Sequence, residues 1–177
     1  MNQKFARGSL LLSGSTIALC LAMSSVAGAA DLTWDGKTDS DWFNANNWVG
    51  DTLPAPDDNV KITDPAAPND PVLSTKAFNL GTGAVDVDAD SFTINNGGTL
   101  TSGGSSVGEN AAGTAIVTGK NSTWNTTAMN VGVSYAGTLT IADGGMVSST
   151  VGLIGREGFP GFFTGDGTVT VTGTDST

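Results

Sequence analysis

The chain has 177 residues, which is enough for one domain with a sizeable core, and its formal net charge is −10. A surface this acidic is a poor partner for nucleic acid or anionic lipid. The sequence contains no histidine, which removes the commonest general base and the commonest metal ligand and excludes a Ser-His-Asp catalytic triad.

Residues 1–30 predict a secretory signal peptide that is removed from the mature protein. Two basic residues open the segment, residues 10–23 are mostly apolar, and small residues follow that would allow cleavage after Ala29 or Ala30. The apolar stretch is short for a membrane span and is interrupted by serine and glycine. An uncleaved membrane anchor is therefore the less favoured alternative.

The only cysteine, Cys20, lies inside this leader. A lipid-attachment site would require a small residue directly before the cysteine, where this chain has Leu19, so lipidation is disfavoured. The mature chain then has no cysteine, and disulfides cannot stabilise it. It keeps five basic residues and all seventeen acidic residues, which gives a net charge of −12.

Composition divides the rest of the chain into two regions. Residues 31–71 hold Trp34, Trp42 and Trp48 together with five prolines, which interrupt strands and indicate loops or sheet edges. Residues 72–177 are rich in Gly, Thr, Ser and Val, with short alternating runs and no long helical pattern. We expect residues 31–71 to form an N-terminal cap in which the tryptophans are buried, in preference to stacking on sugars, and residues 72–177 to form a repetitive β domain.

Three apolar landmarks recur together in the second region every 23 or 24 residues. Only the last step is longer, because of a seven-residue insertion between Arg156 and Gly167. This regularity fits a coil that contains about three short strands. The first landmark falls at Phe92, Ala115, Leu139 and Val169, the second at Leu100, Trp124 and Val147, and the third at Val107, Val131 and Ile154.

Strand geometry then selects the fold. Side chains alternate between the two faces of a strand, so Leu139 and Ile141 point inward and Thr140 points outward. Stacking coils about 4.8 Å apart pairs each strand with its equivalents and buries the apolar faces in one core. The glycine pairs at 97–98 and 144–145, with the Asn or Asp beside them, predict corners with positive φ.

The predicted fold is therefore all-β: a right-handed parallel β-helix, or solenoid, of about 23–24 residues per coil. The alternative is an antiparallel sandwich or barrel built from hairpins. Hairpins have no reason to keep three landmarks in register over successive coils, so the solenoid is favoured.

The end of the sequence lacks a recognisable cap, although solenoids need their open sheet edges covered. By alignment with residues 122–124, the next residue after Ser176 and Thr177 should be a tryptophan. We therefore expect the chain to be an N-terminal fragment of a longer protein, with repeats that are incomplete at the C-terminus.

Several short sequence segments resemble a known family of repeats. They are Gly-Thr-Leu-Thr-Ile-x-x-Gly-Gly-x-Val at 137–147, Ile-Gly at 154–155 and Gly-Thr-Val-Thr-Val-Thr-Gly-x-x-Ser at 167–176. They resemble the autotransporter-associated repeat, which occurs in the passenger regions of bacterial autotransporters, the type V secretion proteins. The opening Thr-Trp-Asp-Gly at 33–36, with Asp-Trp at 41–42 and Asn-Trp at 47–48, is similar to the start of such passengers.

The resemblance implies a signal peptide, a β-helical passenger and a C-terminal outer-membrane β-barrel translocator, whose strands are missing from this chain. Family passengers are often adhesins or passive stalks, so host surfaces or other cells are the further partners implied. We expect export through the periplasm to the outer-membrane surface or the medium, and a structural or adhesive role without catalysis or cofactor. A secreted structural protein that never had a barrel is one alternative.

Asp86, Asp88 and Asp90 alternate, so in a strand they would share one face, where three carboxylates could bind calcium. A solvated acidic face opposite Val85 and Val87 is the simpler interpretation and is favoured. The glycine-rich nonapeptide repeat that binds calcium in other solenoids is absent from the sequence.

A carbohydrate-active β-helix enzyme or a secreted carbohydrate-binding protein is the alternative function. Asp57 and Asp58 form the only adjacent acidic pair, in the proline-rich stretch and without a nearby histidine or arginine. A glycosidase needs two carboxylates placed across a sugar, and nothing in the sequence points to that geometry.

Two further features are candidates for modification or contact. Residues 121–123, Asn-Ser-Thr, match the N-glycosylation sequon, although a turn is the favoured interpretation. The seven-residue insertion brings Phe159, Phe162 and Phe163 together around a proline. Insertions in solenoids loop out, often on the binding face, so the three phenylalanines form a possible contact loop. That the loop folds back over an edge is an equal alternative.

Overall fold

The computed structural model describes residues 29–155 and 165–177. The expected signal peptide, apart from its last two residues, and the possible contact loop with Phe159, Phe162 and Phe163 lie outside the described residues. In the described ranges, no helix is long and apolar enough to cross a membrane.

Parallel strands dominate the described part of the chain, which has only one short 3-10 helix, η1 (Ala45–Asn47). One sheet has seven strands in the order β1-β2-β5-β7-β9-β11, with β4 also paired to β7, and the other has five in the order β12-β10-β8-β6-β3. The strands are β1 (Asp31–Thr33), β2 (Asn59–Ile62), β3 (Val72–Ser74), β4 (Ala77–Asn79), β5 (Val85–Val87), β6 (Ser91–Asn95), β7 (Thr99–Val107), β8 (Gly113–Thr118), β9 (Thr123–Val131), β10 (Gly137–Ala142), β11 (Met146–Ile154) and β12 (Gly167–Thr172).

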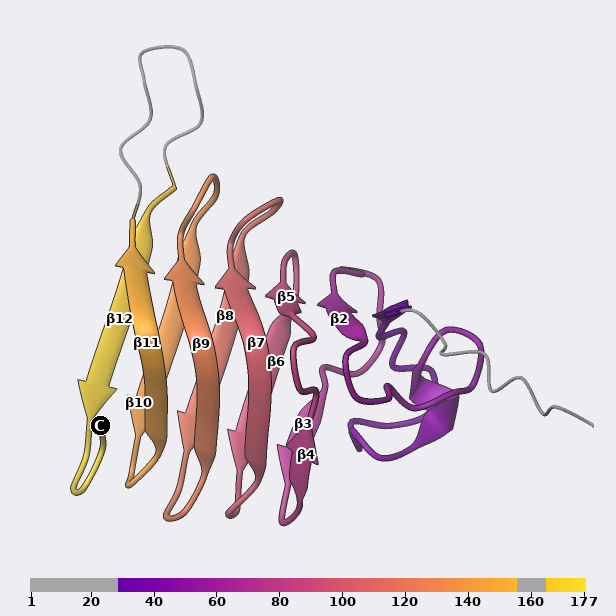
Figure 1. Ribbon diagram of the computed structural model, residues 1–177, viewed down its shortest axis with the longest axis horizontal. Coiled ribbons are helices and arrows are strands. Elements are labelled where there is room, and N and C mark those ends of the chain that lie inside the picture. Colours follow the sequence, from indigo (N-terminus) through magenta and orange to yellow (C-terminus); the bar gives the residue numbers. More distant parts are fainter. Residues whose placement is uncertain (1–28, 156–164) are drawn as a thin grey trace, which may run out of the picture.

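The chain winds between the two sheets, so that successive coils lie side by side along one axis (Figure 1). All pairs between the strands named above are parallel, and an isolated antiparallel bridge outside them joins Trp34 to Trp48. The predicted parallel β-solenoid is therefore confirmed, and the hairpin-built sandwich or barrel is wrong.

The predicted register is confirmed residue by residue. Phe92 pairs with Ala115, Ala115 with Leu139, and Leu139 with Val169 in the five-stranded sheet. In the seven-stranded sheet the second and third landmarks stack in the same way, Leu100 on Trp124 on Val147 and Val107 on Val131 on Ile154. The repeat read from the sequence is thus the repeat of the backbone ladder.

The expectation of three short strands per coil needs one correction. The second and third landmarks lie on a single nine-residue strand, as in β7 and β9. The inward positions of β7 shift in phase between Ser102 and Ser105, and the ladder leaves Gly103 without a paired residue. In the preceding coil the two halves are separate strands, β4 and β5, which pair with the two ends of β7.

Buried hydroxyl groups satisfy one another at this bend. The Oγ atoms of Ser102 and Ser105 lie 2.9 Å apart, and Ser105 Oγ lies 3.2 Å from Thr126 Oγ1 in the next coil. Trp124 Nε1 donates to Ser102 Oγ at 3.2 Å. Because each buried polar group has a partner, the bend carries no large desolvation cost.

The core lies between the two sheets and follows the predicted alternation. Leu139 and Ile141 are 2% and 4% exposed, and the intervening Thr140 is half-buried on the outer face. Phe92, Ile94, Ala115 and Val117 fill the same inward columns in earlier coils and are fully buried. Burying an aliphatic side chain of this kind stabilises the fold by about 1.5–3 kcal/mol.

The glycine pairs at the corners serve two different purposes. Gly97 and Gly144 have φ of 80° and 84°, and the preceding Asn96 and Asp143 also have positive φ, as predicted. The second glycine of each pair does not: a Cβ on Gly98 would lie 2.3 Å from the Leu73 carbonyl oxygen. That glycine is needed because the neighbouring coil passes too close for any side chain.

Candidate functional site

The tryptophans of residues 31–71 form part of the core. Trp34, Trp42 and Trp48 are all fully buried, and the Trp48 ring contacts both others edge-on, at 5.1 and 4.9 Å between centroids. Trp42 also contacts Phe92 of β6, which in turn contacts Trp124 of β9 at 5.4 Å. Rings buried in this way present no face on which a sugar could stack.

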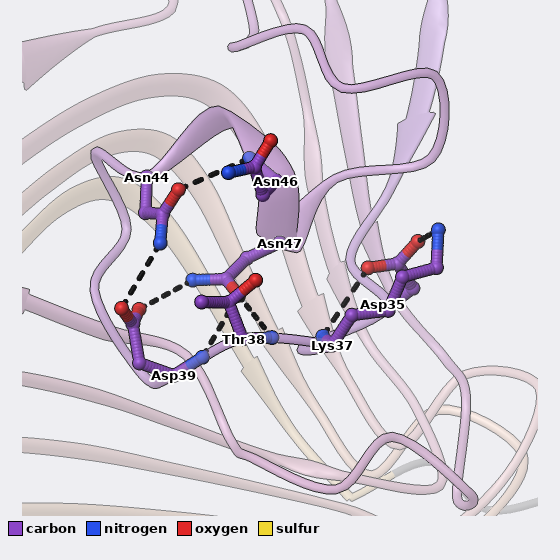
Figure 2. A network of polar contacts seen from close by, with 7 residues as sticks. All are labelled: Asp35, Lys37, Thr38, Asp39, Asn44, Asn46 and Asn47. Carbon is purple, nitrogen blue, oxygen red and sulfur yellow. Dashed lines mark hydrogen bonds and ion pairs between the residues drawn. The ribbon is translucent and has the colours of Figure 1, made fainter.

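A polar network around Asn47 shapes the loop beside these rings (Figure 2). The fully buried Asn47 amide accepts from the backbone N–H groups of Thr38 and Asp39 at 2.9 and 3.0 Å. Its Nδ2 donates to Asp39 Oδ1 at 2.7 Å and to the Asp41 carbonyl at 3.0 Å. The Asn47 side chain is thereby saturated.

Asp39 completes the network on its solvent-exposed side. Its other carboxylate oxygen accepts from Asn44 Nδ2 at 2.9 Å, and Asn44 Oδ1 accepts from the Asn46 N–H to cap η1 (Figure 2). These hydrogen bonds, the one from Asn47 above all, lower the pKa of Asp39. The Asn and Asp residues of this cluster therefore have a structural role, because their donors and acceptors form hydrogen bonds within the loop itself.

The three alternating aspartates do not form a ligand set. Asp86 accepts from Ser106 Oγ at 2.8 Å, and burial raises its pKa. Asp88 is 2% exposed, and its two oxygens accept from the backbone and side chain of Asn110 and from the Glu109 N–H. Among residues 29–155 and 165–177, no three acidic groups are placed to hold a metal ion.

Asp90 has a different partner. One of its oxygens accepts from the Ser91 N–H at 2.8 Å, and its side chain is hydrogen-bonded to Asp70. Burial, together with the hydrogen bond from this second carboxyl group, raises the pKa of Asp90 to about 7. The Asp70 side chain, from the loop before β3, thus lies against the Asp90 carboxyl group just before β6.

The adjacent acidic residues Asp57 and Asp58 also accept hydrogen bonds from backbone N–H groups. Asp57 Oδ1 accepts from both the N–H and the hydroxyl of Thr82, at 2.9 and 2.8 Å, which lowers the pKa of Asp57. Asp58 accepts from the N–H groups of Ala30 and Ala55, each at 2.8 Å. Both carboxylates therefore hold loops in place through these hydrogen bonds.

The sequon at residue 121 lies on a tight corner. Asn121 is exposed with φ of 67°, while Ser122 is fully buried and its Oγ accepts from the Gly97 N–H at 3.0 Å. The serine and the positive φ explain this corner as a turn between coils.

A groove that the sequence did not reveal lies where the first region meets the solenoid. It has a volume of about 380 Å³, and Phe43 and Lys76 line it with the Lys76 ammonium 4.6 Å from the ring centroid. The two residues are brought together only by coil stacking, so no local motif signals them. The rest of the lining is Ser40, Asp41, Val72, Ser74 and Thr75.

A second, shallower hollow of about 220 Å³ runs across β7, β9 and β11. It is lined only by hydroxyl and amide side chains. Each strand contributes equivalent positions, such as Thr101, Asn125 and Ser148, which pair across the ladder. This row is an uncharged polar surface on a strongly acidic protein, suited to hydrogen bonding with a neutral partner.

No family model, no curated protein and no solved structure matches the chain.

Proposed function

We propose that this chain is a passenger segment of a bacterial autotransporter, displayed at the cell surface or released, with a structural or adhesive role and no catalytic activity. The observation that supports this most is the in-register stacking of 23–24-residue coils. Such a ladder extends by adding coils and keeps one cross-section, which suits a stalk that carries outward-facing rows of polar side chains.

The lack of cysteine in the mature chain also supports the proposal. A passenger must cross the outer membrane unfolded, and a chain free of disulfides can do so even after exposure to the oxidising periplasm. The proposed partners are a β-barrel translocator and, at the surface, host surfaces or other cells.

The proposal is tested by surface display. Residues 1–177 are fused before an outer-membrane β-barrel translocator and produced in a Gram-negative host. We expect leader cleavage after Ala29 or Ala30 and digestion of the solenoid by protease added to intact cells. Retention of the fusion inside the outer membrane, with the barrel correctly inserted, would refute the passenger role.

A matched variant sharpens this test. Thr114→Cys with Thr138→Cys places two cysteines on directly paired positions of β8 and β10. We expect the disulfide to arrest translocation and dithiothreitol to restore it, since the unlinked chain must pass unfolded.

Adhesion is then measured by the settling and surface attachment of displaying cells against cells that display the barrel alone.

A further inference from the structure

The outer face of the five-stranded sheet carries an array of threonine side chains. Side chains alternate along a strand, so the residues between the core positions of β6, β8, β10 and β12 point away from the core. None of these outward residues is charged, and most are threonine. The outward threonines are Thr93, Thr114, Thr118, Thr138, Thr140, Thr168, Thr170 and Thr172.

Strand pairing sets these threonines in rows. Thr114 pairs with Thr138 and Thr138 with Thr168, while Thr140 pairs with Thr170 in the next row. Neighbours in a row lie about 4.8 Å apart across the strands, and residues two positions apart along one strand lie about 6.6 Å apart. Because the strands of successive coils run side by side, the rows form a two-dimensional grid (Figure 1).

The hydroxyl groups of this threonine grid are available to a partner. Within the described residues, none of the grid threonines makes a side-chain hydrogen bond to another group of the protein. Thr126 of the other sheet differs, because its Oγ1 donates to the carbonyls of Gly103 and Ala128. The branched side chain restricts χ1 and the ladder fixes the backbone, so little conformational freedom is lost when the grid meets a surface.

The other sheet does not present such a face. Lys61 and Asp86 lie at its outward positions, and its long strand β7 bends at the unpaired Gly103. The threonine grid is therefore both the more regular and the less charged of the two outer faces. On a chain with a formal net charge of −10, an uncharged face favours a partner without charge.

The residues between the threonines narrow the choice of partner. The outward positions of β6, β8, β10 and β12 hold no aromatic ring on which a sugar could stack. Their apolar members, Ile116 and Ala142, each lie between two polar residues of a row, so they form no apolar patch for a second copy of the chain. What remains is a rigid grid of hydroxyl and methyl groups, which suits a partner that itself repeats in two dimensions.

We propose that the threonine grid binds ice. The prism face of hexagonal ice repeats in a rectangular grid whose two spacings are close to those of the threonine rows, so successive hydroxyl and methyl groups meet equivalent positions on it. Each contact is weak, and the shared spacing lets many of them form at once. This ligand goes beyond the structural or adhesive role proposed above and does not rest on it.

The test measures how much of the full chain enters ice grown slowly in its solution, against a protein of similar size that does not bind ice. Thr138→Lys puts a long, charged side chain inside the grid. Asn125→Lys makes the same change of charge at an outward position of the other sheet and is the matched control. Ile116→Thr completes an unbroken row of threonines from Thr93 to Thr170.

We expect the native chain and Asn125→Lys to be enriched in the ice, Thr138→Lys to stay in the liquid, and Ile116→Thr to be enriched further. Circular dichroism checks that each chain is folded, and if Thr138→Lys does not fold, the gain or its absence in Ile116→Thr decides. Exclusion of the native chain from ice would overturn the proposal, as would equal enrichment of the two lysine variants. A native chain that stays out of ice and instead binds insoluble cellulose, or dimerises through this face, would show another occupant and overturn it too.

Discussion

The rings of Trp42 and Phe92 lie 5.2 Å apart, centroid to centroid, and join the tryptophan-rich region to the first long coils. Trp42 reaches Trp48 on one side, and Phe92 reaches Trp124 on the other. The aromatic core therefore runs without interruption from residues 31–71 into the solenoid. Both β1 and β2, which come from that first region, also join the seven-stranded sheet.

Replacing Trp42 with alanine should cost about 3–5 kcal/mol of unfolding free energy, since it removes a fully buried ring that contacts three others. Val49→Ala, at a 57% exposed position, should change the free energy by about 0.5 kcal/mol or less. Chemical denaturation measures both. Similar losses for the two variants would show that the aromatic contacts do not join the regions.

Replacing Asn47 with alanine should cost about 2–4 kcal/mol, because it leaves the N–H groups of Thr38 and Asp39 without their acceptor. The neighbouring Asn46 is exposed, so Asn46→Ala should stay within about 0.5 kcal/mol. Urea titrations of the two proteins provide the comparison. A tolerated Asn47→Ala would mean that water or another group replaces the amide.

The inward face is tested by a pair of aspartate substitutions on β10. Ile141→Asp buries an unpartnered charge at a position that is 4% exposed and should destabilise the fold by about 4 kcal/mol or more. Thr140→Asp lies on the outer face and should cost about 1 kcal/mol or less. Far-ultraviolet circular dichroism during thermal unfolding reports both, and equal effects would mean that the faces are misassigned.

Much of this arrangement follows from the sequence because the repeat is a property of the backbone. Phe92, Ala115 and Leu139 occupy one column, and a stacked strand has no other register in which all three landmarks stay inside. The inward face and the corners of positive φ follow from the same periodicity. The number of strands per coil did not follow from the periodicity, because it depends on the bend at Gly103. A Cβ at Gly103 would lie 2.3 Å from the Thr82 carbonyl oxygen, which is a contact with the neighbouring coil.

Candidate sites were less predictable than the fold. The alternation of Asp86, Asp88 and Asp90 suggested one shared face. Asp88 instead accepts from the Glu109 N–H at a corner between coils, and the Asp90 side chain lies against that of Asp70. Those partners come from other coils and from a loop that does not repeat. The groove of Phe43 and Lys76 was missed for the same reason, since its two sides are distant in sequence.

The carboxyl pair of Asp70 and Asp90 predicts a pH dependence of stability. The pKa of Asp90 rises from 3.8 to about 7 on folding, through burial first and then the hydrogen bond with Asp70. The folded state therefore favours the protonated carboxyl group, and its contribution is complete below pH 3.8. That contribution is lost as the pH rises through about 7.

Unfolding free energies measured from pH 4.5 to pH 8.5 should fall for the native chain relative to Asp90→Asn, which cannot ionise. The lowered pKa values of Asp31 and Asp39 act in a separate window, because their contribution is lost only as the pH falls below 3.8. Parallel curves for the two proteins above pH 4.5 would show that Asp90 ionises normally in the folded chain.

The stacking of 24-residue coils is tested most directly by cross-linking in a chain with Cys20→Ser. Thr114 and Thr138 are paired residues on neighbouring parallel strands, about 4.8 Å apart, which is within the range that a disulfide spans. Oxidation of Thr114→Cys with Thr138→Cys should give a full intramolecular disulfide in the folded protein. Thr114→Cys with Ala142→Cys, offset by about 13 Å along the strand, should give none. A disulfide in the offset pair, or none in the paired one, would contradict the solenoid.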